Sequence, residues 1–351
     1  MKRILLTGGG TAGHVTPNIA LLPKLHEYGF EIHYIGTKSG MERTLIEREN
    51  ILYHPISAGK LRRYFDFKNL TDVFRIFLGF IQSILIFAKI KPCIVFSKGG
   101  FVSCPVVWAA WLFRIPVVIH ESDITPGLAN RLSIPFAKKI CYSFPETSNH
   151  LSSKKAVHTG IPVRRQLFSG NKTEGMKICN FTDDKPSLLI ICGSLGSQTI
   201  NEAVKLSLDE LLCEFNICHI VGNGGLTGNR PGYQQFEYVN DELSHLFALA
   251  DIIISRSGAT ALFEFLALKK PSLLIPLSTN ASRGDQILNA RSFEKQGFSR
   301  ILLQENLSKD TLIEGVKDVF KNRESIIKAI SDFPATDSIE SVMKVITETC
   351  R

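Results

Sequence analysis

Several features that mark special classes of protein are missing from this chain. Its eight cysteines form no Cys-x-x-Cys pair and mostly stand in apolar, strand-like runs. That spacing is typical of reduced thiols in a protein core, and it argues against a disulfide framework and against a zinc site. No charged and then apolar leader precedes the first strand-like run, so we expect a protein that is not exported.

Long runs of one charge are missing as well. Lys and Arg number 41 and Asp and Glu 33, which gives a formal net charge of +8. A basic protein suits nucleic acid, an anionic membrane surface or a phosphorylated substrate. The basic residues stand only in short groups, such as Arg62 with Arg63 and Arg164 with Arg165. We therefore expect no nucleic-acid partner.

Short apolar runs alternate with helix-like segments along the chain. Continuous apolar strands separated by helices are typical of parallel sheets covered on both faces, the doubly wound α/β architecture. Hydrophobic residues make up 44% of the sequence and charged residues 21%, as in globular proteins with a full core. The predicted strands read RILLT, EIHYIG, CIVFS, PVVIH and KKICYS in the first half, and SLLIIC, ICHIVG, DIIIS and SLLIP in the second.

A polar, turn-rich stretch from about Gly160 to Pro186 interrupts this alternation. A chain of 351 residues is longer than one domain usually grows, so we expect two domains. We predict a first Rossmann-like domain over residues 1–160 and a second over 161–335, each with a glycine turn after its first strand. The segment 336–351 has apolar residues at helical spacing and is a candidate to pack back on the first domain.

Residues 73–90 are mostly apolar, with Arg75, Gln82 and Lys89 recurring every seven residues as one polar stripe on a helix. Only 13 residues separate Arg75 from Lys89, fewer than the roughly 20 that a membrane-spanning helix needs. A buried helix is the favoured interpretation. The alternative is a membrane-contact patch, because basic residues that could hold anionic headgroups flank it at Arg62, Arg63, Lys68, Lys89 and Lys91.

The stretch GGGTAGHVTP, residues 8–17, follows the first predicted strand. Glycines after a strand let backbone N–H groups approach a phosphate, and the next helix offers its positive N-terminus. A dinucleotide-binding unit would also place an acid at the end of its second strand, but EIHYIG ends in Gly36 and Thr37. A nicotinamide-dependent dehydrogenase therefore loses most of its support, and the Walker lysine pattern is missing too.

His14 stands at or near the start of the first predicted helix, where the helix dipole disfavours the imidazolium form. A neutral imidazole is what a general base needs near neutral pH. A histidine that only caps the helix or orders the loop fits the sequence equally well, so both interpretations stay open.

Three more stretches occupy positions where an α/β sheet binds ligands, beyond the carboxyl ends of strands. They are SKGGFVS at 97–103, HESDITPGLAN at 120–130 and SRSGATALFE at 255–264. A second glycine turn, CGSLGSQ at 192–198, opens the second half. Each alone is explained by a helix cap and a turn, but their recurrence favours a polyhydroxylated, phosphorylated ligand.

These motifs, together with GKLRR, GIPVR and SRGDQILNA, resemble the MurG family of peptidoglycan glycosyltransferases, in order from Arg3 to about Ala290. The resemblance implies the GT-B fold of two Rossmann-like domains facing a cleft. It implies an inverting transfer of N-acetylglucosamine from UDP-N-acetylglucosamine (UDP-GlcNAc) to the C4 hydroxyl of the muramyl sugar of undecaprenyl-pyrophosphoryl-muramoyl-pentapeptide, lipid I. The product would be lipid II, made by a peripheral protein on the cytoplasmic face of the cell membrane.

The resemblance also implies roles for matching residues. The UDP-GlcNAc donor would be bound in the second half by Arg164, Gly193, Ser194, Gly196, Ser257, Gly258, Glu264, Asp285 and Gln286. The lipid I acceptor would be bound in the first half by Thr11, Ala12, Gly13, His14, Gly99, Gly100 and Asn130, with the apolar helix on the membrane.

His14 is the first candidate for the base that takes the acceptor proton, and Glu121 and Asp123 are the next. Asp123 would also approach the transferred sugar. We expect no cofactor and no metal ligands, because no Asp-x-Asp stands at a strand end, although a role for Mg²⁺ stays open. Arg164 and the helix N-terminus after Ser194 would then neutralise the leaving UDP.

The chain departs from the commoner MurG pattern at four positions. Ala12 replaces a glycine, Ile161 an asparagine, and Asp123 and Asp285 amides. An aspartate accepts hydrogen bonds from a hydroxyl but cannot donate one. Three alternatives therefore stay open: a GT-B transferase acting on diacylglycerol, a UDP-sugar epimerase, and a lipid-pyrophosphate-binding protein without turnover.

Overall fold

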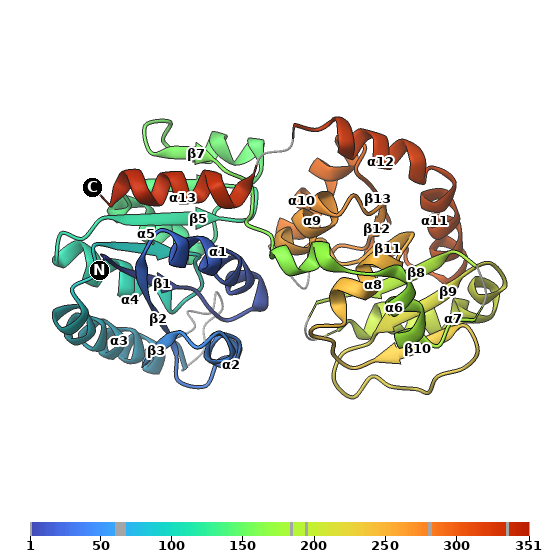
Figure 1. Ribbon diagram of the computed structural model, residues 1–351, viewed down its shortest axis with the longest axis horizontal. Coiled ribbons are helices and arrows are strands. Elements are labelled where there is room, and N and C mark those ends of the chain that lie inside the picture. Colours follow the sequence, from blue (N-terminus) through green and yellow to red (C-terminus); the bar gives the residue numbers. More distant parts are fainter. Residues whose placement is uncertain are drawn as a thin grey trace. The chain divides into compact units, whose positions relative to one another are not determined.

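The computed structural model describes residues 2–59, 68–182, 185–193, 196–279, 283–334 and 337–350 (Figure 1). They form two compact units. The first comprises Met1–Arg164 and Thr336–Arg351, and the second comprises Arg165–Ala335. Residues 161–164, expected in the second domain, thus belong to the first unit.

The first unit is built on a seven-stranded sheet of order β3-β2-β1-β4-β5-β6-β7. All its strand pairs are parallel, with Ile4 of β1 opposite Ile32 of β2 on one side and Ile94 of β4 on the other. The strands are β1 (Lys2–Thr7), β2 (Phe30–Thr37), β3 (Leu52–Ile56), β4 (Ile94–Ser97), β5 (Val117–Glu121), β6 (Lys139–Tyr142) and β7 (Ala156–His158).

Helices cover both faces of this sheet. Ile4 and Leu6 of β1 lie in one buried cluster and Leu5 in another, because alternate residues of a strand point to opposite faces. The helices are α1 (Thr16–Glu27), α2 (Met41–Arg48), α3 (Lys68–Ile90), α4 (Ser103–Leu112), α5 (Leu128–Ser133) and α13 (Ser338–Thr349), with short 3₁₀ turns η1 (Ala12–His14), η2 (Ile134–Phe136) and η3 (Pro145–His150).

The C-terminal helix α13 packs in the core of the first unit. It contacts α1 and strands β4, β5 and β6, and Figure 1 draws it in red beside that sheet. Val342, Met343 and Ile346 are fully buried in the cluster that also holds Ile4. The last helix of the chain therefore covers the same sheet to which the first strand, β1, belongs.

The second unit repeats the plan with a parallel six-stranded sheet of order β10-β9-β8-β11-β12-β13. Its strands are β8 (Ser187–Ile191), β9 (Asn216–Ile220), β10 (Tyr233–Phe236), β11 (Ile252–Ser255), β12 (Ser272–Leu274) and β13 (Ser299–Ile301). Its helices are α6 (Lys172–Cys179), α7 (Gln198–Glu214), α8 (Leu243–Leu249), α9 (Ala259–Ala267), α10 (Asp285–Lys295), α11 (Lys309–Lys321) and α12 (Arg323–Asp332), with 3₁₀ turns η4 (Arg165–Ser169) and η5 (Gln304–Asn306).

Helix α3 corrects the favoured prediction of a buried helix. Its inner face packs on α4 and buries Phe87 completely, but Phe74 is 75% exposed and Leu85 is 65% exposed. Within it, Asp72–Ile90 is apolar and long enough to cross a membrane by length and composition alone, and only 22% of an 18-residue stretch of it is buried. The structure therefore shows a helix of the first unit that exposes an apolar face.

Candidate functional site

The two predicted acceptor turns meet at the carboxyl edge of the first sheet. The turn after β1 contains Gly8 to Gly13, and the turn after β4 contains Gly99 and Gly100, which have φ angles of +92° and +84°. A methyl group on Gly100 would collide with the carbonyl oxygen of Gly9. Glycine at 100 is thus required both by its backbone conformation and by the contact between the turns.

Two buried side chains support the first turn from inside the unit. The Tyr34 hydroxyl donates to the Gly8 carbonyl at 2.7 Å, and the Glu42 carboxylate accepts from Gly10 N at 3.3 Å and from Thr37 N at 3.0 Å. Glu42 is fully buried. An anion bound at this turn must therefore use N–H groups other than that of Gly10, or displace Glu42.

His14 lies beside these turns, in the 3₁₀ turn Ala12–His14 that leads into α1. Its backbone N–H donates to the Thr11 carbonyl at 3.1 Å, and its side chain is partly exposed. Ala12 and Gly13 are also partly exposed, and Thr11 is exposed. The expected acceptor residues of this segment thus share one accessible turn, while their roles stay predictions.

The loop after β5 is organised around the carboxylate of Glu121. Its Oε1 accepts from Asp123 N at 3.0 Å, and its Oε2 accepts from Gly127 N at 3.1 Å and from Asn130 Nδ2 at 2.8 Å. Glu121 is only 4% exposed. Burial, and next the charge of Asp123, raise the pKa of the Glu121 carboxyl, while these three hydrogen bonds act the other way.

The structure therefore separates the two acidic candidates for the base. The Glu121 carboxylate is engaged inside the loop, whereas the Asp123 side chain is partly exposed. A general base must come within hydrogen-bond reach of the proton that it removes. Asp123 meets that requirement better than Glu121, and His14 remains the first candidate.

Asn130 lies inside the unit beneath the second turn. Its Nδ2 also donates to the His120 carbonyl at 3.3 Å, and a methyl group on Gly99 would come within 3.0 Å of its Oδ1. The residue is 5% exposed. Its contacts join the Glu121 loop to the Gly99 turn, and a direct contact with an acceptor stays a prediction.

The second unit places its glycine turn after β8. Gly193 and Gly196 have φ angles of +82° and +69°, and a methyl group on Gly196 would collide with the carbonyl oxygen of Val221. Ser197 caps α7, since its hydroxyl accepts from Ile200 N at 3.4 Å. Ser194 lies outside the described residues. The turn thus leads directly into the N-terminus of a 17-residue helix, a favourable place for an anion.

Other predicted donor residues meet at the starts of α9 and α10. The Ser257 hydroxyl donates to the Gln286 carbonyl at 2.8 Å, and the Gln286 side chain accepts from Leu277 N at 3.1 Å. Gly258 caps α9, which carries the buried Glu264. Ser257, Gly258 and Gln286 thus share the carboxyl edge of the second sheet, and Glu264 lies further along α9.

Two further predicted donor residues are charged. Asp285 pairs with Arg283, with Nε and Oδ2 2.5 Å apart. Arg164 ends the N-terminal segment of the first unit, so its contact with a donor in the second unit stays a prediction.

Sequence reasoning overlooked two buried cations at these edges. The Arg256 guanidinium donates to the Ser197 hydroxyl at 2.8 Å and to the Ile275 carbonyl at 2.9 Å, so it joins the glycine turn to the loop after β12. Lys98, in the SKGG turn, is fully buried and donates to the Ser122 hydroxyl. The only signal in the sequence was the nearby glycine of each motif, because Lys98 directly precedes Gly99 and Arg256 stands two residues before Gly258.

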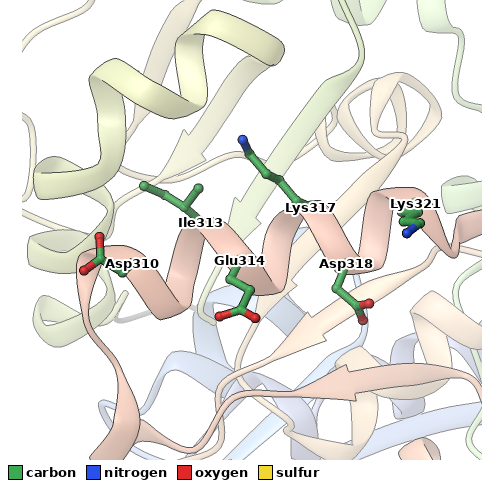
Figure 2. Close-up of a pocket in the computed structure, with 6 residues that line it drawn as sticks. All are labelled: Asp310, Ile313, Glu314, Lys317, Asp318 and Lys321. Atoms are coloured by element: carbon green, nitrogen blue, oxygen red, sulfur yellow. The ribbon is translucent and has the colours of Figure 1, made fainter.

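A surface hollow of about 470 Å³ runs along α11. None of the described residues that are predicted to bind the donor or the acceptor lines it. In Figure 2, Ile313 and Lys317 point to one side of the helix and Glu314 and Asp318 to the other. Lys317 pairs with Glu214 at 2.6 Å. These side chains do not point toward one common position, so the hollow is not a candidate site.

In the described ranges, no group of three or more His, Cys, Asp or Glu residues is placed to hold a metal ion.

Comparison with known proteins covers nearly the whole chain. Residues 4–142 match the glycosyltransferase family 28 N-terminal domain, and residues 187–346 match the glycosyltransferase family 28 C-terminal domain. A solved structure, the crystal structure of Acinetobacter baumannii MurG, superposes with a TM-score of 0.76 over 99% of this chain and 100% of that one, at 24% identity. This likeness confirms the predicted GT-B fold.

Two curated relatives are much closer in sequence. A protein of Clostridium tetani is 53% identical, covering 98% of this chain and 97% of its own length. One of Clostridium botulinum is 54% identical, covering 99% of both. Each is named UDP-N-acetylglucosamine--N-acetylmuramyl-(pentapeptide) pyrophosphoryl-undecaprenol N-acetylglucosamine transferase. With both domain matches and this identity over its full length, the chain belongs to the MurG family of glycosyltransferases, within glycosyltransferase family 28.

Proposed function

We propose that this chain is a hexosyltransferase that moves N-acetylglucosamine from UDP-GlcNAc to the C4 hydroxyl of the muramyl sugar of lipid I, giving lipid II for peptidoglycan. The observation that carries the proposal is the identity of 53% and 54% to two relatives named for this transfer, over nearly the full length of each. A diacylglycerol transferase or an epimerase would share the fold but not this similarity.

The reaction is a single in-line displacement at the anomeric carbon, which inverts its configuration. The acceptor oxygen loses a proton as it attacks, and UDP leaves with its negative charge stabilised. His14, in the accessible turn before α1, takes the proton. Asp123 is the second candidate for this role and also faces the transferred sugar.

The second unit binds the donor. The turn that contains Gly193 and Gly196 presents backbone N–H groups and the N-terminus of α7 to the pyrophosphate, as a helix start does for other anions. Ser194 and Arg164 add polar contacts to the same group. Glu264 accepts from the ribose hydroxyls, and Asp285 with Gln286 binds the hydroxyls of the sugar.

The first unit binds the lipid acceptor. The turns at Gly8–Gly13 and Gly99–Gly100 receive its pyrophosphate, and the helix face of α3 rests on the cytoplasmic surface of the membrane. The support for this surface is the exposed apolar row Val73, Phe74, Phe77, Leu78, Ile81 and Leu85, with Trp111 and Leu112 exposed at the end of the adjacent α4. Arg75 and Lys89 are exposed on the same helix and would meet anionic headgroups.

The experiment is a panel of two donors and two acceptors. Radiolabelled UDP-GlcNAc and UDP-glucose are each incubated with a short-chain lipid I analogue and with diacylglycerol. Labelled lipid from UDP-GlcNAc and the lipid I analogue alone is the expected result. Product only from diacylglycerol or UDP-glucose would contradict the proposal, and conversion of UDP-GlcNAc to its epimer without any lipid product would favour an epimerase.

A further inference from the structure

Lys98 is a buried cation with no part in the mechanism above. It directly follows β4, and its side chain is fully buried. Its ammonium donates to the hydroxyl of Ser122, which belongs to the loop after β5 and is itself buried. An ammonium taken out of water is strongly destabilising unless it is paired, so its surroundings must compensate it.

The compensation comes from the acids on either side of Ser122. Burial lowers the pKa of Lys98 to about 8, and the charges of Glu121 and Asp123 act in the opposite direction. The other titratable groups facing it are His120 and Cys141. His120 is buried and its pKa lies well below the ordinary value, chiefly because of burial and next because of Lys98, so it adds no positive charge.

Lys98 also touches the first acceptor turn. Its backbone N–H donates to the Thr7 carbonyl at 2.9 Å, and a Cβ built on Gly8 would lie 3.1 Å from the Cβ of Lys98. The stem of one side chain thus lies against the turn that carries His14, and its end holds the loop that carries Asp123. A displacement at either place would move a candidate base.

We propose that Lys98 is a positioning residue of the transferase, whose buried ammonium holds Ser122 and balances Glu121 and Asp123 so that the 121–127 loop presents Asp123 to the transferred sugar. This rests on the proposed function, because it gives Asp123 a substrate to face. Lys98 itself is buried and touches no substrate.

The test compares K98M, which has a side chain of similar length without charge, with K98R, which keeps a charge above pH 8. In the wild type, kcat should fall as the pH rises through about 8, because Lys98 then loses its proton. K98M should have a kcat about tenfold to a hundredfold lower and should lack this fall. K98R should retain more activity and keep it to higher pH. The affinity for UDP should change in neither variant.

K270M is the matched control. Lys270 is partly buried, donates to the Ala250 carbonyl at 2.7 Å, and lies in the second unit. Burial lowers its pKa as it does that of Lys98. Because Lys270 belongs to the second unit and the 121–127 loop to the first, K270M should keep the wild-type kcat and pH profile. A K98M enzyme with the same kcat and pH profile as K270M would overturn the proposal.

A second measurement needs neither a variant nor activity. Amide hydrogen exchange of the wild type is followed across residues 121–127 between pH 7 and 9.5, corrected for the intrinsic effect of pH. Exchange at Asp123 and Gly127, which donate to Glu121, should accelerate above about pH 8 relative to other loops. Unchanged protection would overturn the role of Lys98 even if K98M fails to fold. Failure of the wild type to make lipid II would instead count against the proposed function alone.

Discussion

The side-chain nitrogen of Asn130 lies 2.8 Å from Oε2 of Glu121, and both residues are almost completely buried. The Glu121 carboxylate thus accepts from three donors: the Asn130 side chain and the N–H groups of Asp123 and Gly127. A carboxylate so engaged organises a loop and is poorly placed to take a proton from a substrate. Glu121 and Asp123, although two residues apart, thus differ in their surroundings, because Glu121 is buried and Asp123 is partly exposed.

The variant N130A tests this organisation. Removing the donor leaves a buried carboxylate with one hydrogen bond fewer, which should lower the free energy of unfolding of the first unit by about 1–3 kcal/mol. Chemical denaturation measures this, with N149A, on an exposed residue, as control. Equal stability of N130A and N149A would show that the contact does not hold the loop.

The base assignment is tested by H14A. If His14 takes the acceptor proton, kcat should fall by roughly 10²–10⁴-fold, while the affinity for UDP, bound by the second unit, stays unchanged. H26A, which changes an exposed histidine on α1, should behave as the wild type. A kcat for H14A near that of H26A would remove His14 from the mechanism and leave Asp123 as the candidate.

The donor site is tested by E264A. Loss of a carboxylate that accepts from the ribose hydroxyls should weaken UDP binding by about 1.5–3 kcal/mol, or roughly tenfold to more than a hundredfold. Isothermal titration with UDP measures the change. E314A, in the hollow on α11 (Figure 2), is the control. Unaltered affinity in E264A would contradict the ribose assignment, and weakened affinity in E314A would revive the hollow as a binding site.

The membrane surface is tested by F74S and F77S, which change exposed rings on α3. Each ring buried in a bilayer contributes about 1.5–3 kcal/mol, so the double variant should bind anionic phospholipid vesicles at least about a hundredfold more weakly. Its kinetics with a water-soluble acceptor should be unchanged. F87S, at a fully buried position of the same helix, should instead lower stability. Vesicle binding equal to that of the wild type would contradict the assigned surface.

The central strands of both sheets were predictable from the sequence, because strands buried on both faces form continuous apolar runs. The edge strands β3, β7, β10 and β13 were not predicted. Each has only one neighbour in its sheet, and β3 and β7 are largely outside the core, so their sequences mix polar and apolar residues. The glycine turns were found because glycine is the residue that most readily adopts a left-handed conformation, as Gly99, Gly100 and Gly196 do here.

Helix α3 shows where pattern reasoning failed. The favoured prediction was a buried helix, with Gln82 in its polar stripe; the Gln82 side-chain oxygen accepts from Ser57 N at 2.7 Å. Apolar residues of the same helix, such as Phe74 and Leu85, are exposed. Lys98 and Arg256 were not predicted, because what distinguishes them is burial and a hydrogen bond to a residue distant in sequence. Neither property can be read from the neighbouring residues in the chain.

The central claim is that one displacement joins N-acetylglucosamine to the C4 hydroxyl of the muramyl sugar. The most direct test is to purify the product formed from UDP-GlcNAc and a lipid I analogue, and to determine its mass, linkage position and anomeric configuration by mass spectrometry and NMR. The account predicts one added N-acetylglucosamine at C4, with the configuration opposite to that in UDP-GlcNAc. A product of retained configuration, a linkage elsewhere or no transfer would contradict it.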